Sequence, residues 1–348
     1  MPRKVCVAAV QMDAALAPTA DRLARADRLV AQAAHAGAQL VVLPELFNTG
    51  YAYDDANYFL AEPPGGPTTA WMKGAAVRLN IHLAGSLMLL DGRQIYDALL
   101  LLAPDGRMWR YDKCYPALWE RSYFRGGSHI TVADTELGGL GMMVCWDVAH
   151  RNLWKGYAGR VDMIVISSCP PDVTNPTFHF PNGDRLTFDD MGPIMAALKG
   201  VGGLTFGDMI DRQTAWLGVP AVNAAGSGHV QTRLPNGLAT LLAFLPVAPR
   251  LVRYLFQANQ AQMSCGMVPG CKVVGADGQV LTCLTQAQGE AFAVAEVMLA
   301  DERPSPCKRQ PVSSLPWTAY WMSDLMIPAL CAPVYRKGLR RMRQVSRL

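Results

Sequence analysis

Three ionisable residues of this sequence each stand at the end of an apolar stretch that reads as a strand or hairpin. They are a carboxylate, Glu45, an ammonium, Lys113, and a thiol, Cys145. Strand ends in α/β folds converge on one edge of a sheet, so side chains in these places can meet although they are far apart in the chain. The pattern predicts a catalytic centre at this edge.

The three side chains together form a chemically complete set. A deprotonated thiol attacks an electrophilic carbon. A carboxylate accepts the thiol proton when burial raises its pKa toward neutrality, and a lysine stabilises the resulting oxyanion. Each residue alone is a weak signal, because a lone buried cysteine is usually inert and a single Glu or Lys more often forms a structural ion pair.

The elements that would position these residues are read from apolar runs, helical spacing and turn residues. Gly37 stands where a helix commonly stops, and Pro44 ends the second strand. The alternation of strands, hairpins and helices predicts an α/β sandwich with one core. Strands are expected at residues 4–11, 39–43, 81–90, 96–103, 107–111, 138–144, 161–167, 217–223, 271–275 and 291–297, and helices at residues 20–36, at residues 70–79 and after Cys145.

Longer segments around the three residues carry a family resemblance. Residues 37–51 include Leu-Pro-Glu-Leu-Phe-Asn-Thr-Gly-Tyr, residues 111–113 read Tyr-Asp-Lys, and residues 141–147 read Gly-Met-Met-Val-Cys-Trp-Asp. In this order and spacing they resemble the glutamate, lysine and nucleophile motifs of the nitrilase superfamily of carbon–nitrogen hydrolases, in its amidase or carbamoylase branch. The resemblance runs from about residue 4 to about residue 297; it also includes residues 7–12, 220–226 and 269–278, with Cys271 in place of a serine.

The resemblance implies a four-layer α-β-β-α sandwich, dimerised through a helical layer, that hydrolyses non-peptide C–N bonds without a metal or cofactor. It implies that Glu45 deprotonates Cys145, which forms a thioester, and that Lys113 and the backbone N–H of Trp146 stabilise the oxyanion. The family also has a second glutamate, and Glu120 matches its position. Glu120 would orient Lys113 and the substrate nitrogen; the alternative is an exposed loop acid.

The substrate is less well defined by the motifs. We predict that Tyr51, Trp146 and Cys169 contact it. After Asp147 the family amidases carry an arginine, an aromatic residue and Pro-Glu, whereas residues 148–151 here read Val-Ala-His-Arg, so no known substrate can be transferred. Asp147 itself resembles the amidase and carbamoylase branches and favours amides over nitriles.

Composition limits the other classes of protein. The chain has 348 residues, 51% of them hydrophobic, which suits a large core. Nine cysteines without CxxC pairs indicate buried thiols rather than a disulfide framework, and no His/Cys spacing suits zinc. The apolar start is too short for a secretory signal, so we expect a cytoplasmic protein.

The hydrolase domain is expected at residues 1–298 and a C-terminal extension at residues 299–348. Two stretches, about 174–213 and 231–263, look like insertions into the family core. The net charge of +4 depends on a basic tail, and without it the rest of the chain is acidic, so nucleic-acid binding is not expected. The tail contains Arg336, Lys337, Arg340, Arg341, Arg343 and Arg347.

Apolar residues at 238–256 and 315–335, together with the arginines, allow two interpretations. The first is packing on the core or on a partner subunit. The second is peripheral contact with the inner face of a membrane through residues 238–256 and 315–348, which would suit an amide with a long apolar chain. In either case the two segments are expected on one side of the molecule, near the pocket mouth.

Three classes of function remain open. The leading hypothesis is hydrolysis of an amide or carbamoyl compound, with nitrile hydrolysis as an alternative substrate choice. A second is acyl transfer from an amide to a lipid or amine acceptor in place of water. A third, a non-catalytic binding protein on the same fold, is disfavoured because Glu45, Lys113 and Cys145 are all present.

Overall fold

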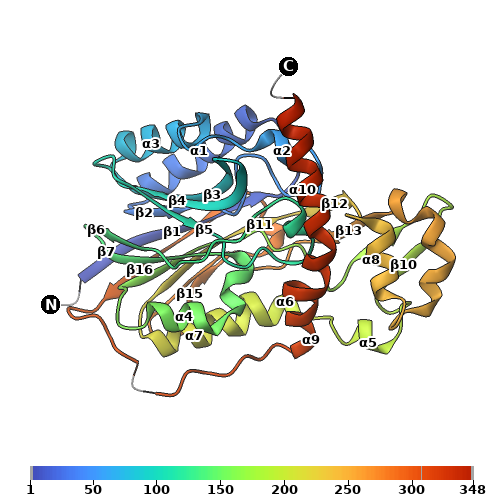
Figure 1. Ribbon diagram of the computed structural model, residues 1–348. Coiled ribbons are helices and arrows are strands. Elements are labelled where there is room, and N and C mark those ends of the chain that lie inside the picture. Colours follow the sequence, from blue (N-terminus) through green and yellow to red (C-terminus); the bar gives the residue numbers. More distant parts are fainter. Residues whose placement is uncertain (1–2, 307, 346–348) are drawn as a thin grey trace.

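The computed structural model describes residues 3–306 and 308–345, and a large β-sheet of two halves forms its centre (Figure 1). In the first half, β1 pairs with β2 in parallel and with β16 in antiparallel orientation. The strands of this half are β1 (Arg3–Asp13), β2 (Leu40–Val42), β3 (His82–Asp91), β4 (Gln94–Leu102), β5 (Met108–Asp112) and β16 (Ala291–Leu299).

The second half continues from the first where β1 pairs in parallel with β11, at Gln11 opposite Ala225. Strands β3, β4 and β5 of the first half contact β7 and β8 of the second across an apolar interior, so the halves face each other. The strands of the second half are β6 (Val132–Thr135), β7 (Gly138–Val144), β8 (Met163–Ser167), β11 (Ala221–Ser227), β14 (Lys272–Val274) and β15 (Val280–Cys283).

Helices cover the two outer faces of this pair of sheets (Figure 1). On one side lie α1 (Thr19–His35) and α3 (Pro67–Leu79), and on the other lie α4 (Arg151–Tyr157) and α7 (Ile210–Leu217). Because strands buried between layers need apolar residues on both faces, β2 and β8 are almost continuously apolar. The architecture is the predicted α-β-β-α sandwich, which confirms the fold class.

The two predicted insertions fold together into a separate lobe. Its strands β9 (Thr177–His179), β10 (Arg185–Thr187), β12 (His229–Arg233) and β13 (Gln262–Gly266) form a second sheet in the order β10-β9-β13-β12. None of these strands was predicted from the sequence. The lobe also contains α5 (Pro193–Ala196), α8 (Gly237–Phe244) and the 3₁₀ segment η4 (Pro249–Gln260), and α6 (Val201–Gly203) with the π-helical η3 (Leu204–Met209) leads back to the core.

The C-terminal extension ends in a nearly continuous helix that runs along the side of the sandwich, between the core and the lobe (Figure 1). It consists of α9 (Trp317–Tyr320), the π-helical η6 (Trp321–Met326) and α10 (Ile327–Val345). Ile327, Cys331, Leu339 and Met342 are buried. Among residues 3–306 and 308–345, no helix is long and apolar enough to cross a membrane. The remaining short helices are α2 (Asn57–Leu60), η1 (Leu118–Ser122), η2 (Cys145–Ala149) and η5 (Gln286–Gln288).

Candidate active site

The ends of strands β2, β5 and β7 bring the three predicted residues together. Lys113 follows β5 directly, and its Nζ lies 2.6 Å from Oε1 of Glu45. Cys145 follows β7 directly and lies against the same carboxylate. All three are buried, with exposed fractions of 0% for Lys113, 2% for Glu45 and 5% for Cys145. The structure therefore has the convergence that the strand ends predicted.

Backbone strain is concentrated at this site. Cys145 adopts a left-handed conformation with φ of 47°, Leu46 has φ of 51°, and Leu118 has φ of 48°. Non-glycine residues rarely adopt positive φ, and such conformations persist where the surrounding structure enforces them. The sharp turn at Cys145, between β7 and η2, presents the thiol to the cavity described below.

Glu120 lies beside Lys113 rather than in solvent. Its Oε2 is 2.6 Å from Lys113 Nζ and accepts a 2.7 Å hydrogen bond from the backbone N–H of Ala117. The hydroxyl of Tyr51 donates to Oε1 at 2.6 Å. The glutamate comes from η1 and is 3% exposed, so its side chain is fixed by three partners in the protein interior.

The protonation states follow from burial and from the central ammonium. Burial opposes the charge on Lys113, but Glu120 and Glu45 outweigh it and hold the pKa of the ammonium well above its usual value. Burial also acts to raise the pKa of Glu45, yet Lys113 and hydrogen bonds hold it below the usual value. Burial and the Glu45 charge raise the pKa of the Cys145 thiol. The resting site thus holds a protonated thiol against an ionised carboxylate.

A third buried carboxyl, Asp97 on β4, was missed from the sequence. Its Oδ1 accepts a 2.7 Å hydrogen bond from Ser86, while its Oδ2 is 3.7 Å from Lys113 Nζ and has no hydrogen-bond donor. Burial, with the charge of Glu45, raises the pKa of Asp97 well above its usual value. When Asp97 carries a proton, its carboxyl group donates a hydrogen bond to Glu45. The available signal was an aspartate within the apolar run of residues 96–103.

Replacing Asp97 with asparagine is expected to stabilise the protein increasingly as the pH rises. The folded-state pKa of Asp97 lies above its unfolded value, so its contribution to stability is complete in acid and is lost as the pH rises toward the folded-state pKa. An amide keeps the donor and cannot ionise. Urea unfolding at several pH values above about 4 should show the variant gaining on the parent by about 1.4 kcal/mol per pH unit. A gap that does not change with pH would contradict a protonated Asp97.

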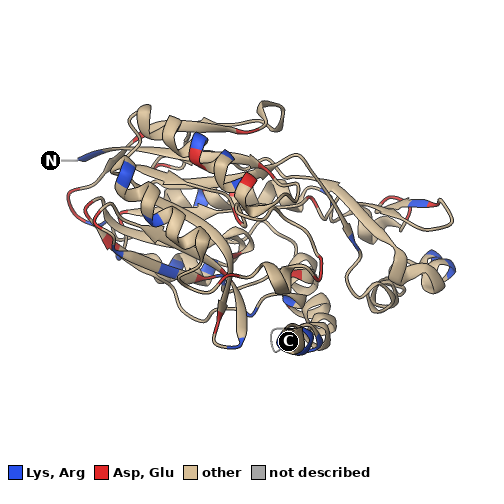
Figure 2. Cartoon of the chain, turned by 90° about the horizontal axis from the view of Figure 1, so that it is seen from above, with Lys and Arg blue, Asp and Glu red and all other residues tan. Residues whose placement is uncertain are grey.

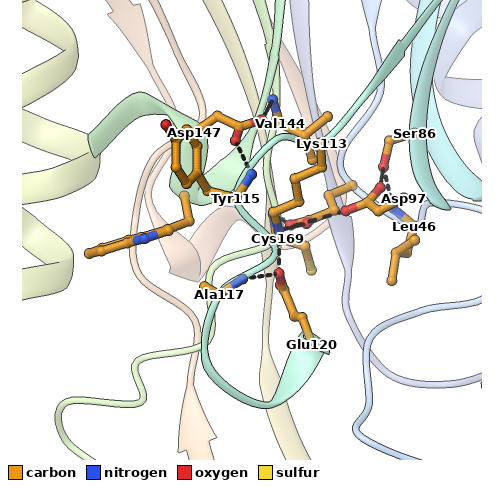
Figure 3. Close-up of polar contacts among 12 residues, drawn as sticks. Leu46, Ser86, Asp97, Lys113, Tyr115, Ala117, Glu120, Val144, Asp147 and Cys169 are labelled. Carbon is orange, nitrogen blue, oxygen red and sulfur yellow. Dashed lines mark hydrogen bonds and ion pairs between the residues drawn. The ribbon is translucent and has the colours of Figure 1, made fainter. Parts of the chain in front are cut away.

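Asp147 holds together the loop that follows Lys113 and the turn at Cys145 (Figure 3). One carboxylate oxygen, Oδ2, accepts from the hydroxyl of Tyr111 at 2.7 Å and from the backbone N–H groups of Cys114 and Val144 at 3.3 Å. The other accepts from the N–H of Tyr115 at 2.8 Å. The sequence analysis used this residue only to distinguish family branches, but its contacts fix the turns that carry the lysine and the thiol.

A mostly apolar cavity opens above Cys145 and includes about 820 Å³ of space, counting the part open to solvent. Tyr51 and Trp146, both predicted substrate contacts, line it together with Glu120. Cys169, the third, is not among the lining residues, and its backbone N–H donates to Oε2 of Glu45 at 2.8 Å. Cys169 therefore supports the carboxylate through its main chain.

The two apolar segments, residues 238–256 and 315–335, meet near this cavity, as predicted. Phe244 of α8 and Met322 of η6 both line it, and the side chain of Asn236 donates to the carbonyl of Leu330 at 3.1 Å. Each addition buries one face and exposes another, so neither interpretation of these segments describes them completely. Within the described ranges no group of His, Cys, Asp and Glu could hold a metal ion, and eight cysteines are free; Cys307 lies outside these ranges.

Comparison with known sequences gives the family. Residues 6–182 match the sequence profile of the carbon–nitrogen hydrolases, over half of the chain. The chain belongs to the carbon–nitrogen hydrolase family. This confirms the resemblance to the nitrilase superfamily that the three motifs carried, and the matched range contains Glu45, Lys113, Glu120 and Cys145.

Relatives within this family are similar over part of their length. A nitrilase of Pyrococcus abyssi is 31% identical over 147 residues, which are 41% of this chain and 56% of that protein. A chloroplastic omega-amidase of Arabidopsis thaliana is 28% identical over 163 residues, 42% of this chain and 44% of that protein. The matched part thus spans about half the length of these curated relatives.

Solved structures of the family show the same fold. A nitrilase superfamily member of Saccharomyces cerevisiae superposes with a TM-score of 0.60 at 19% identity, covering 84% of this chain and 90% of that one. A variant of the amidase from Nesterenkonia sp. AN1, in complex with butyramide, superposes with a TM-score of 0.58 at 19% identity, covering 84% and 90%.

Proposed function

We propose that this carbon–nitrogen hydrolase cleaves the C–N bond of linear amides through a thioester on Cys145. The observation that carries the proposal is the buried ion cluster of Glu45, Lys113 and Glu120 beside that thiol, at an apolar cavity that Glu120 and Cys145 help to line. A buried charge cluster is costly to maintain for stability alone, and perturbed pKa values of this kind are typical of functional sites.

In the first half of the reaction, ionised Glu45 takes the proton of the Cys145 thiol, and the sulfur forms a bond to the amide carbon. The carbonyl oxygen becomes an oxyanion, stabilised by the Lys113 ammonium and by the N–H of Trp146 in the first turn of η2. Glu45 then gives its proton to the nitrogen, the C–N bond breaks, and the amine leaves.

In the second half, Glu45 takes a proton from water, whose oxygen attacks the thioester carbon. The C–S bond breaks, the carboxylic acid leaves, and the proton returns to the sulfur. Glu120, bonded to Lys113 at 2.6 Å, keeps the ammonium in place and faces the substrate nitrogen. Glu45 thus transfers a proton in both halves, so the site stays compact.

Mass spectrometry of the intact protein tests the proposal. With a panel of short amides, the expected result is a mass increase equal to the acyl group, located on the peptide that contains Cys145, together with ammonia release. Absence of any acyl adduct on that peptide, with ammonia released, would contradict the thioester mechanism. Offering the matching nitriles and a primary amine acceptor distinguishes nitrile hydrolysis and acyl transfer, because the latter yields the N-acyl amine.

We also propose peripheral contact with an anionic membrane through the face that flanks the cavity mouth. Trp317, Trp321 and Leu325 follow one another at helical spacing of four residues, and are 74%, 44% and 64% exposed. Residues at this spacing share one face of a helix. The lobe adds further exposed apolar side chains at Leu238, Leu242, Val252 and Phe256.

Exposed basic residues follow the apolar face along the same helix. Arg336, Lys337 and Arg340 of α10 are exposed, and Lys and Arg cluster on this helix near its C-terminal end (Figure 2). Apolar side chains near clustered cations suit the interface of an anionic bilayer, where each cation contributes about 1 kcal/mol. Arg341 instead pairs with Asp55.

Vesicle flotation tests this contact. Full-length protein is expected to float with vesicles containing anionic phosphatidylglycerol at low salt, and less at high salt or with phosphatidylcholine alone. Leu325→Ser should weaken binding about 10-fold or more, because one buried leucine contributes roughly 1.5–3 kcal/mol. Leu16→Ser changes a similarly exposed leucine, between β1 and α1 and outside both proposed contact segments, and should have no effect. Binding that is absent at low salt, or unchanged by Leu325→Ser, would contradict the proposal.

A homodimer or larger homo-oligomer, which the family resemblance implies, also remains a proposal. In that case the exposed apolar face would contact a second subunit instead of lipid. Sedimentation velocity of the same preparation, with Leu325→Ser beside Leu16→Ser, would distinguish a subunit interface from a lipid contact, because only the former makes the oligomer dissociate.

A further inference from the structure

The outer wall of the cavity is built by the additions to the family core. Both predicted insertions and the predicted C-terminal extension contribute lining residues, and Cys145 and Glu120 line the same cavity. The residues from the additions are mostly apolar and include Phe188, Leu198, Phe206, Phe244, Ala319 and Met322. Three segments far apart in the sequence thus form one apolar wall over the thiol.

Three polar groups of the lining already have partners inside the protein. The Thr205 hydroxyl donates to the carbonyl of Val201 at 2.8 Å, and the indole N–H of Trp119 donates to Thr240 at 3.2 Å. The indole N–H of Trp146 donates to Asp324 at 2.9 Å. A polar substituent beside these three groups would therefore lose water and gain no equivalent partner.

The charges of the lining also select against acids. The described residues that line the cavity include no Lys or Arg, and the ionisable carboxyls are Glu120 and Asp172. A carboxylate on the substrate would be buried without a counterion and near like charge, which is strongly unfavourable. The lining therefore suits neutral groups. Apart from Glu120 at the catalytic end, Asp172 is the carboxylate in the lining that a cationic substituent would pair with.

The polarity of the cavity also orients the substrate. In the proposed reaction the amide nitrogen gains a proton from Glu45 and lies toward Glu120, whose second oxygen is held by Tyr51. That end of the cavity is therefore polar. The group on the other side of the carbonyl carbon must extend into the apolar part, toward Leu198 and Phe244.

We propose that the additions form an acyl pocket, and that the substrates are primary amides of uncharged, apolar carboxylic acids longer than butyric acid. This inference rests on the proposed amide hydrolysis and defines its substrate class. An aliphatic chain of six to eight carbons, or a phenyl-substituted chain, buries its methylenes against this wall, as apolar ligand pockets generally require.

The amides acetamide, butyramide, hexanamide and octanamide test the length dependence. Each methylene buried in the transition state should raise kcat/KM about fourfold, as expected for about 0.8 kcal/mol per CH₂. Adipamic acid, which carries a terminal carboxylate, should be far poorer than hexanamide. A kcat/KM that is flat or falls beyond butyramide, or a preference for a charged chain of either sign, would overturn the acyl pocket.

Two variants test where the acyl chain of the substrate lies in the cavity. Leu198→Trp fills the wall and should lower kcat/KM for octanamide at least 10-fold more than kcat/KM for acetamide, and circular dichroism shows whether the variant is folded. Leu242→Trp makes the same change at an exposed position outside the lining and should change neither. Phe244→Ala enlarges the pocket and should move the optimum to a longer chain.

These results separate the two levels of the argument. Equal losses of kcat/KM for acetamide and octanamide in folded Leu198→Trp, with an unshifted optimum of chain length in Phe244→Ala, would place the acyl chain elsewhere. If acetamide still acylates Cys145 in that case, amide hydrolysis stands and only the acyl pocket fails. If no amide of any length acylates Cys145, the proposed function itself fails.

Discussion

Replacing Cys145 with alanine is expected to lower amide turnover by about 10⁴-fold or more while the protein stays folded, as removal of a nucleophile does in other covalent enzymes. The side chain is small and stands at the end of a cavity, so its loss leaves little unfilled core. Cys145→Ser should be nearly as inactive, because a hydroxyl is much harder to deprotonate than a thiol. Ammonia release and circular dichroism measure the two effects separately.

The matched control is Cys271→Ala, which removes a thiol that is 1% exposed at the edge of β14, outside the cavity lining. It should retain turnover, with a small loss of stability. Iodoacetamide should label Cys145 in the parent protein, and prior incubation with a turned-over amide should slow this labelling. Turnover of Cys145→Ala near the parental rate would remove this residue from the mechanism.

The positions of Glu45, Lys113 and Cys145 could be predicted because each depends on local features. A buried strand is recognisable as an apolar run, and its end fixes where the next side chain points. Asp97 could not be assigned in this way, since its role depends on two carboxyls and one ammonium from other strands. Cys169 was assigned to the substrate, whereas its main chain contacts Glu45, a distinction that only the backbone path reveals.

The lobe shows a second limit of prediction from sequence. Strand β9 lies in the first predicted insertion and pairs with β13 at the end of the second, with Phe178 opposite Met263. Strands of three to five residues carry little periodicity, and pairing between segments about 85 residues apart leaves no local signal. Composition showed that the second predicted insertion was apolar enough to pack, but the first looked polar, and nothing local indicated that the two pack together over the thiol.

Replacing Lys113 with methionine is expected to lower both stability and activity. The ammonium lies among Glu45 and Glu120, at 2.6 Å from each, and Asp97, at 3.7 Å. Removing one partner of a buried ion pair costs about 3–5 kcal/mol, because the remaining charge is left uncompensated. Loss of an oxyanion donor lowers kcat by about 10²–10³-fold. Urea unfolding and amide turnover measure the two effects.

A suitable control is Lys272→Met. Lys272 is also buried, at 6% exposure, and its ammonium pairs with Asp211 and the carbonyl of Gly207, outside the cavity. This variant should lose less stability, because Asp211 is partly exposed and can be hydrated, and it should keep its turnover. If Lys272→Met and Lys113→Met lose equal activity, the effect of Lys113 is structural and not chemical.

The pH dependence of Lys113→Met distinguishes a lost charge from lost packing. Without the ammonium, burial and mutual repulsion raise the pKa of each of the three carboxyls above its unfolded value. A raised folded-state pKa means that the folded protein binds more protons, so the variant should become less stable as the pH rises above about 4. In the parent, the pKa of Glu45 is lowered, so its ionised form stabilises the folded protein at higher pH. This contribution is lost in acid. The stability gap between parent and variant should therefore widen with pH, whereas a packing defect would leave it constant.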